Sequence, residues 1–206
     1  MVTAAKKPLN IKVANGGKMS PRLDRGSPKA SVGSKSKSPF AGLPVRNIVY
    51  SNGATYDGQV NAMNQREGQG KLKFAGDKAV FEGIFEGGQM SKGKVTYLEQ
   101  AGGECSFEGT FKGNQWGKGI YTKGGATYEG TFADQTMKGK FKITWPSKVV
   151  YEGGVQNNEL HGEGVMTFPP GHGKIKEVKG TWKSDLEKCA LLTMENGDTA
   201  TNYNHL

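Results

Sequence analysis

Cysteine and histidine are scarce in this chain of 206 residues, which holds two cysteines and three histidines. Cys105 and Cys189 are far apart in the sequence, and no Cys-x-x-Cys pair is present. This spacing excludes the usual zinc sites and a disulfide framework. We therefore expect two free thiols, no metal and no cofactor.

The chain also lacks long apolar runs, and acidic residues are scarce near its N-terminus. No stretch approaches the length of a transmembrane helix, so we expect none. The first 46 positions hold ten basic residues and one acid, Asp24. That segment carries a charge of +9, which is the net charge of the whole chain, because the remainder balances 18 basic against 18 acidic residues.

Glycine is abundant, at 32 residues, and much of it lies in a recurring phrase. The phrase reads aromatic, acid, glycine, any residue, large apolar residue, and it starts at Tyr56, Phe81, Phe107, Tyr128 and Tyr151. Such a near-constant period indicates a repeat architecture. The repeated residue types are structural, so the pattern argues against an enzyme.

A second phrase, Gly-x-Gly before an apolar segment, lies between the copies, most fully at Gly68–Gly70. The two phrases predict paired strands in which the aromatic and the glycine share one face and the acid lies on the other. Glycine there leaves room for a neighbouring ring. We assign a structural role to Tyr56, Gly58, Phe81, Gly83, Phe107, Gly109, Tyr128, Gly130, Tyr151 and Gly153. We expect the acids to pair across strands with Lys71, Lys94, Lys118 and Lys140.

We predict an all-β fold, a single-layer elongated ribbon of stacked antiparallel hairpins over residues 45–199. The ribbon holds about six repeats. The last repeat begins at Val178–Trp182 and is degenerate, which is common for the terminal repeat of a stacked array. Ile48–Tyr50 supplies a further strand at the other end. Residues 1–44 are rich in Ser, Pro and Gly and are predicted to form a disordered tail. Residues 200–206 form the C-terminal end.

The two phrases together resemble the MORN repeat (membrane occupation and recognition nexus), which opens with Tyr-Glu-Gly-x-Phe/Trp and continues to Gly-x-Gly. The resemblance covers residues 45–199 and implies a non-enzymatic scaffold. Short MORN arrays without a catalytic domain are similar to cytoskeletal proteins of the ciliary or flagellar axoneme, including radial spokes and microtubule-associated complexes. The resemblance thus implies a cytoplasmic, cytoskeletal location and axonemal protein partners. A peripheral membrane tether that binds anionic phospholipids is the alternative, and a homodimer stays open.

The tail is predicted to bind an acidic partner. Its candidate binding residues are Lys6, Lys7, Lys12, Lys18, Arg22, Arg25, Lys29, Lys35 and Lys37. Tubulin and anionic lipid are the candidate partners. Nucleic acid is not expected, because Phe40 is the tail's one aromatic residue and bases would have little to stack on. A solvated linker that binds nothing is the alternative.

Three serines in the tail precede a proline and are candidate phosphorylation sites: Ser20, Ser27 and Ser38. Each phosphate would subtract roughly 1.5 to 2 charges, so three would cancel much of the positive charge. Ser-Pro pairs are also common in disordered segments without any regulatory role.

Overall fold

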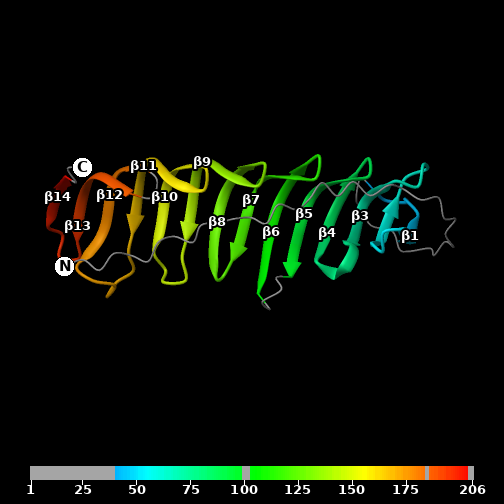
Figure 1. The fold of residues 1–206 in the computed structure, drawn as a ribbon, viewed down its shortest axis with the longest axis horizontal. Helices are drawn as coiled ribbons and strands as arrows, with labels where there is room; N and C mark the ends of the chain where they lie inside the picture. Colours follow the sequence, from blue (N-terminus) through cyan, green and yellow to red (C-terminus); the bar gives the residue numbers. More distant parts are fainter. Residues whose placement is uncertain (1–39, 99–102, 184–185, 204–206) are drawn as a thin grey trace. The chain divides into compact units, whose positions relative to one another are not determined.

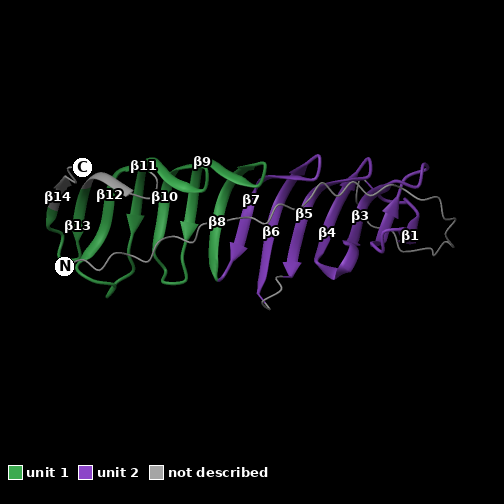
Figure 2. Ribbon diagram, in the orientation of Figure 1, with its two compact units in different colours: residues 1–15, 125–206 green, residues 16–124 purple. Residues whose placement is uncertain are grey.

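The computed structural model describes residues 40–98, 103–183 and 186–203. The chain divides into two compact units, of which unit 2 comprises residues 16–124 and unit 1 comprises residues 1–15 and 125–206 (Figure 2). Within each unit the strands form an antiparallel sheet and follow one another in chain order. The predicted all-β class built from consecutive hairpins is therefore confirmed in both units.

Unit 2 contains one leading strand and three hairpins (Figure 1). A three-residue 3₁₀ turn, Ala75–Asp77, lies between its first two hairpins. The strands are β1 (Val45–Val49), β2 (Thr55–Val60), β3 (Arg66–Lys73), β4 (Ala79–Glu86), β5 (Gln89–Leu98), β6 (Glu104–Lys112) and β7 (Gln115–Lys123).

Unit 1 contains three hairpins and one trailing strand (Figure 1). Its strands are β8 (Ala126–Ala133), β9 (Thr136–Thr144), β10 (Val150–Gln156), β11 (Glu159–Thr167), β12 (Ile175–Lys183), β13 (Leu186–Met194) and β14 (Thr199–Tyr203). The predicted degenerate repeat is the hairpin β12–β13. The end of the array predicted at Thr199 is the first residue of β14, which pairs with β13.

Two-residue turns close the hairpins β4–β5, β6–β7, β8–β9 and β10–β11, and both central residues of each turn adopt left-handed backbone angles. In the β10–β11 turn, Asn157 and Asn158 have φ of 53° and 69°, and in the β6–β7 turn Gly113 and Asn114 have φ of 58° and 67°. Paired left-handed residues give the twist that matches antiparallel strands, and Asn and Gly tolerate them best. The residues of these turns are therefore suited to the left-handed angles that the turns need.

The first glycine of the Gly-x-Gly phrase lies at a bulge. Opposite the single residue Gln59 of β2, strand β3 places the three residues Glu67–Gln69. Gly68 at the centre of this bulge has φ of 70°, and Gly162 at the matching place in β11 has φ of 77°. Residues with a Cβ rarely adopt these angles, so glycine is required at Gly68 and Gly162.

The aromatic residues of the opening phrase form the core of each sheet, on what we call the inner face. In unit 2 their rings touch in an unbroken series from β2 to β7, mostly edge to face. The contacts are Tyr56–Phe85, Phe85–Phe81, Phe81–Phe111, Phe111–Phe107, Phe107–Trp116 and Trp116–Tyr121, with ring centroids 4.6–5.3 Å apart. Each such pair adds about 0.5–1.5 kcal/mol to the stability given by burial.

Candidate binding surface

The glycines of the two phrases oppose each other on the inner face of four hairpins, β2–β3, β4–β5, β6–β7 and β10–β11. Gly83 of β4 pairs with Gly93 of β5, and the same arrangement joins Gly109 of β6 to Gly119 of β7. A Cβ on Gly83 would lie 2.6 Å from the Gly93 Cα and 2.9 Å from the Phe81 Cζ. The two backbones and the ring above them therefore leave no room for a side chain.

The ring over each glycine pair comes from the glycine's own strand, two residues earlier. Phe107 lies over Gly109 and Gly119 in this way. The sequence predicts a neighbouring ring at these glycines, and at Gly130 that ring comes from the opposing strand. There Phe141 of β9 replaces the opposing glycine, and its Cδ1 lies 2.6 Å from where a Gly130 Cβ would be.

The opening aromatics are buried, and two of them also bond to the bulge. Tyr56 and Tyr151 are fully buried. The Tyr56 hydroxyl donates to the carbonyl oxygen of Gln59 at 2.6 Å, and the Tyr151 hydroxyl donates to that of Gly154 at 2.8 Å. These rings are therefore committed to the core, and a partner would have to contact other residues.

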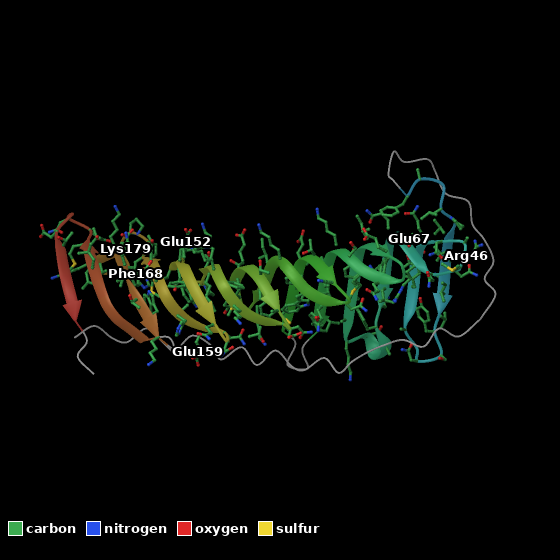
Figure 3. All side chains as sticks on the ribbon, turned by 90° about the horizontal axis from the view of Figure 1, so that it is seen from above. Arg46, Glu67, Glu152, Glu159, Phe168 and Lys179 are labelled. Atoms are coloured by element: carbon green, nitrogen blue, oxygen red, sulfur yellow. The ribbon has the colours of Figure 1, made fainter. Side chains whose placement is uncertain are left out.

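The acids of the opening phrase lie exposed on the opposite, outer face, as predicted. They form a row with lysines from adjacent strands, and Glu152 and Lys179 of this row are labelled in Figure 3. Lys71 Nζ lies 2.5 Å from Glu82 Oε1, and Lys142 Nζ lies 2.7 Å from Glu152 Oε1. Both pairs are about half exposed, so each contributes little to stability.

Two of the four predicted lysine partners are correct and two are wrong. Lys71 and Lys94 oppose acids. Glu108, however, faces Ile120 rather than Lys118, and Glu129 faces Lys142 rather than Lys140. The reason is the bulge, which shifts the register of the return strand before it reaches the acid row.

The outer face of unit 1 therefore carries two exposed lysines away from the acid row. Lys138 of β9 opposes Gln156 of β10, and Lys140 opposes Gly154, which has no side chain. Lys142 on the same strand is held by Glu152, whose hydrogen bond and negative charge raise the pKa of that lysine. Lys138 and Lys140 thus form a small basic surface.

Arg66 begins β3 on the inner face of unit 2, where the other hairpins place an apolar residue such as Met90 or Leu160. Its guanidinium carbon lies 5.2 Å from the Phe85 ring centroid and 5.9 Å from that of Tyr50. Its Nη2 donates to the carbonyl oxygen of Gly88 at 2.6 Å. These are cation–π contacts of the kind that stabilise a partly desolvated arginine.

Burial around Arg66 shifts the pKa values of several groups. Desolvation lowers the pKa of Arg66 from its ordinary value, while the tyrosines beside it act in the opposite direction. Burial raises the pKa of Tyr50 and of Tyr56, and the positive charge of Arg66 opposes both increases. Arg66 nevertheless stays charged at neutral pH, because the ordinary guanidinium pKa is far above 7.

The segment Phe40–Pro44, which the sequence assigns to the tail, contacts the first hairpin. Gln59 Nε2 donates to the Phe40 carbonyl oxygen at 2.8 Å, and the Val60 amide donates to that of Pro44 at 2.9 Å. The Phe40 side chain lies over Gly68: a Cβ added to Gly68 would be 2.8 Å from the Phe40 Cβ. Phe40 therefore packs against the end of the sheet.

Two sets of polar side chains have structural roles that sequence reasoning did not assign. In the bulges, Gln59 Oε1 accepts from the Gln69 amide at 2.8 Å, and Thr110 Oγ1 accepts from the Lys118 amide at 3.1 Å. In the turns, Asn158 Oδ1 accepts from the Met137 amide of the preceding hairpin at 2.8 Å. The sequence feature that could have indicated the role in the turns is the recurrence of Asn as the second turn residue, at Asn114 and Asn158.

The predicted tail sites lie outside the described residues, namely the nine basic positions from Lys6 to Lys37 and the serines Ser20, Ser27 and Ser38. Among the residues that are described, no group of three or more His, Cys, Asp or Glu side chains could hold a metal ion. In the same residues, no helix has the length and apolarity needed to cross a membrane.

Comparison with protein families agrees with the hairpin geometry. The family model "MORN repeat" matches residues 56–77, 107–125 and 151–173. The chain is a MORN-repeat protein. The three matched MORN segments begin in β2, β6 and β10, whose hairpins carry the complete Gly-x-Gly phrase, for example Gly117–Gly119. The intervening hairpins lack part of that phrase, as at Lys92–Lys94.

No curated protein matched the chain. MORN repeats are in general a non-catalytic binding module, found in scaffolds that bind proteins or membranes. For this MORN protein, the candidate binding surface is therefore the outer face of each unit, because the inner-face rings are buried.

Proposed function

We propose that this protein is a non-enzymatic scaffold of a cytoskeletal assembly in the ciliary or flagellar axoneme. Its MORN hairpins bind protein partners, and its basic N-terminal segment binds an acidic surface such as that of tubulin. The observation that carries the proposal is that the net positive charge lies in the N-terminal segment, whereas the folded hairpins are balanced in charge. The net charge of +9 lies in the first 46 residues, while the outer faces alternate acids with lysines.

Acids and lysines alternate across the strands of the outer face. This arrangement suits the recognition of a protein surface more than attraction to a uniformly acidic polymer. In unit 2, Lys71 lies between Asp57 and Glu82, and Lys94 lies between Glu82 and Glu108. A row of this kind presents complementary charges at fixed spacing, which selects a partner and its register. It has no long-range attraction for microtubules or membranes, so that role falls to the basic segment.

The cytoskeletal and axonemal part of the proposal rests on resemblance to short MORN proteins without a catalytic domain, and on charge. Tubulin surfaces are acidic, and a segment with ten basic residues and one acid complements them. Attraction between exposed charges is screened by salt, so binding through this segment would weaken steeply as ionic strength rises.

Co-sedimentation of the full chain with microtubules tests this proposal. The wild type is compared with a variant in which the nine basic residues from Lys6 to Lys37 are replaced by Gln, at low and at physiological salt. We expect the wild type to bind at low salt and the variant to lose most of that binding. Equal binding by the two chains would contradict the electrostatic role.

Replacing Ser20, Ser27 and Ser38 together by Asp gives a graded version of the same test. Three added negative charges reduce the positive charge of the segment by about a third, so binding should fall but not vanish. Replacing the same serines by Asn is the matched control, because Asn has the size of Asp without its charge. The control should bind as the wild type does.

A peripheral membrane tether is the second candidate function, and Lys138 and Lys140 favour it. They add an exposed basic surface on β9 to the basic N-terminal segment. Basic residues near an anionic leaflet contribute about 1 kcal/mol each. Sedimentation with vesicles of phosphatidylcholine containing phosphatidylserine distinguishes the two functions. Binding to these vesicles but not to microtubules would favour the tether.

A further inference from the structure

Strand β1 leaves one edge of the unit 2 sheet open. It is the first strand of the row, and within the described residues it pairs only with β2 (Figure 1). Proteins usually block such edges with proline, lysine or a bulge. β1 reads Val-Arg-Asn-Ile-Val, its register with β2 is unbroken, and Val49 is 72% exposed.

The hydrogen bonds that flank β1 show which backbone groups point to this open edge. The Pro44 carbonyl accepts from the Val60 amide, and the Tyr50 amide donates to the Ala54 carbonyl, so both point toward β2. Bonding direction alternates along an antiparallel strand. The amides and carbonyls of Val45, Asn47 and Val49 therefore point away from β2.

The charge of Arg46 does not protect this edge. Arg46 opposes Gly58 and so lies on the inner face, at the end of unit 2 (Figure 3). Its Nη1 makes only a long contact of 3.4 Å with the Val45 carbonyl oxygen, one of the edge groups, and its Nε is buried without a partner.

We propose that β1 pairs antiparallel with β1 of a second copy of this chain, about a two-fold axis at Asn47. Each Asn47 then faces its counterpart, and Val45 of each chain faces Val49 of the other. In this register all three edge-facing residues oppose edge-facing residues, so their amides and carbonyls pair completely. The interface is isologous, as a two-fold requires.

The side chains fit the same register. Val45, Asn47 and Val49 all project to the outer face, because they oppose Gln59, Asp57 and Thr55 of β2. The proposed pairing covers the exposed Val49 with a valine and stacks two amides at the centre. Sliding one strand by two residues in either direction loses both valine pairs and the central amide pair. This symmetry of the edge favours a second copy over an unrelated strand.

The basic N-terminal segments set the strength and salt response of this dimer. Residues 1–39 carry nine basic residues and one acid in each chain, so two copies repel each other. Pairing of one short strand also forms a small interface, typical of weak association. We expect a reversible dimer at micromolar concentrations that tightens as salt rises, opposite to the salt response of binding to an acidic polymer.

Light scattering and sedimentation of the full chain measure the association. The expected wild-type mass rises with concentration toward twice 22.1 kDa, and more readily at high salt. Val49→Lys should keep the monomer mass at every concentration tested. Leu98→Lys is the matched control, because Leu98 is also exposed, at 59%, but belongs to β5, and this variant should dimerise as the wild type does.

Single cysteines introduced into the full chain test the register. Across an antiparallel pair, directly opposed residues have Cα atoms about 5.5 Å apart, a distance that a disulfide can span. Asn47→Cys should therefore form a cross-linked dimer on mild oxidation. Val45→Cys alone should not, but it should cross-link when mixed with Val49→Cys. The wild type, with Cys105 and Cys189, gives the background.

Three results would overturn the proposal. The first is a monomer at all concentrations and salt strengths. In that case a second copy does not cover the edge, whether or not another segment or protein does. The second is a dimer that Val49→Lys leaves intact, because it would use a different surface. The third is cross-linking of Val45→Cys alone as efficient as that of Asn47→Cys, because a two-fold at Asn47 keeps the two Val45 residues apart.

Discussion

A methyl group is enough to test the close approach of the two glycines on the inner face. Gly109→Ala places a Cβ 2.6 Å from the Gly119 Cα, so two backbones must separate. Gly130→Ala meets the Phe141 ring instead, and a side chain can shift without a movement of two backbones. We expect the first substitution to lower the free energy of unfolding by about 1–3 kcal/mol, and the second by less.

Urea unfolding of both glycine variants measures the difference. Ala133→Val is the control, because Ala133 is an exposed residue of β8, the strand that also holds Gly130. It should leave stability nearly unchanged. If Gly109→Ala were no more destabilising than Gly130→Ala, the close approach of the two backbones would not explain why position 109 requires glycine.

The β8–β9 turn contains a residue in an unfavourable conformation. Gln135 has φ of 60°, although the corresponding residues of two other turns are Asn114 and Asn158. A left-handed conformation costs a residue with a Cβ about 1–2 kcal/mol, and glycine avoids this cost but loses more entropy on folding. Gln135→Gly should therefore raise the free energy of unfolding by about 0.5–1 kcal/mol. Thermal unfolding checks this result.

Thr136→Gly is the control for Gln135→Gly, because it should lower the free energy of unfolding instead of raising it. Thr136 begins β9 with an ordinary strand conformation, so glycine there relieves no strain; it adds freedom to the unfolded chain and removes the 3.4 Å hydrogen bond from Thr136 Oγ1 to the Asp134 carbonyl oxygen. We expect a loss of about 0.5–1 kcal/mol. A gain from both glycine substitutions would mean that backbone strain is not what Gln135→Gly relieves.

The turn of hairpin β10–β11 also links that hairpin to β8–β9. Asn158 accepts a hydrogen bond from the amide of Met137, a buried residue in the preceding hairpin. Asn158→Gly keeps the left-handed turn but removes this acceptor, so stability should fall by about 1–2 kcal/mol. Amide hydrogen exchange at Met137 should become faster. Asn158→Asp keeps an acceptor oxygen and should resemble the wild type; equal losses in both variants would contradict the link.

The protein should lose stability in alkali, because several tyrosines are buried in it. Burial raises the pKa of Tyr50, Tyr56, Tyr97 and Tyr128 above their ordinary value of 10.0. The folded state thus holds their protons more tightly than the unfolded state does. Their contribution is complete below pH 10 and declines as the pH rises from there toward the folded pKa values.

Urea unfolding between pH 8 and 11.5 measures this decline. Tyr56→Phe removes one of the titrating groups at a position where other repeats naturally carry Phe81 or Phe107. The variant should lose about 1 kcal/mol at pH 8, because the bond to the Gln59 carbonyl is gone. Its alkaline decline should be shallower than that of the wild type. An identical decline would exclude Tyr56 as a cause.

Local periodicity made much of the fold predictable from the sequence. Strand alternation placed Tyr128 and Phe132 inside and Glu129 outside, and Asn157 and Asn158 are polar residues of the kind that turns prefer. The period also predicted the order of hairpins. These features depend on residues close together in the chain, so they could be read without knowledge of the fold.

The tertiary structure alone decided which residues meet across strands. A bulge in β9 shifts its register on β8, which is why Lys142 rather than Lys140 meets Glu129. Contacts between distant segments decided the rest: Phe40 packs on Gly68, Arg66 lies between Tyr50 and Phe85, and β1 keeps an open edge. The sequence by itself determined the repeat and its two faces, because a period of two residues is local, whereas register and edges exist only once strands have paired.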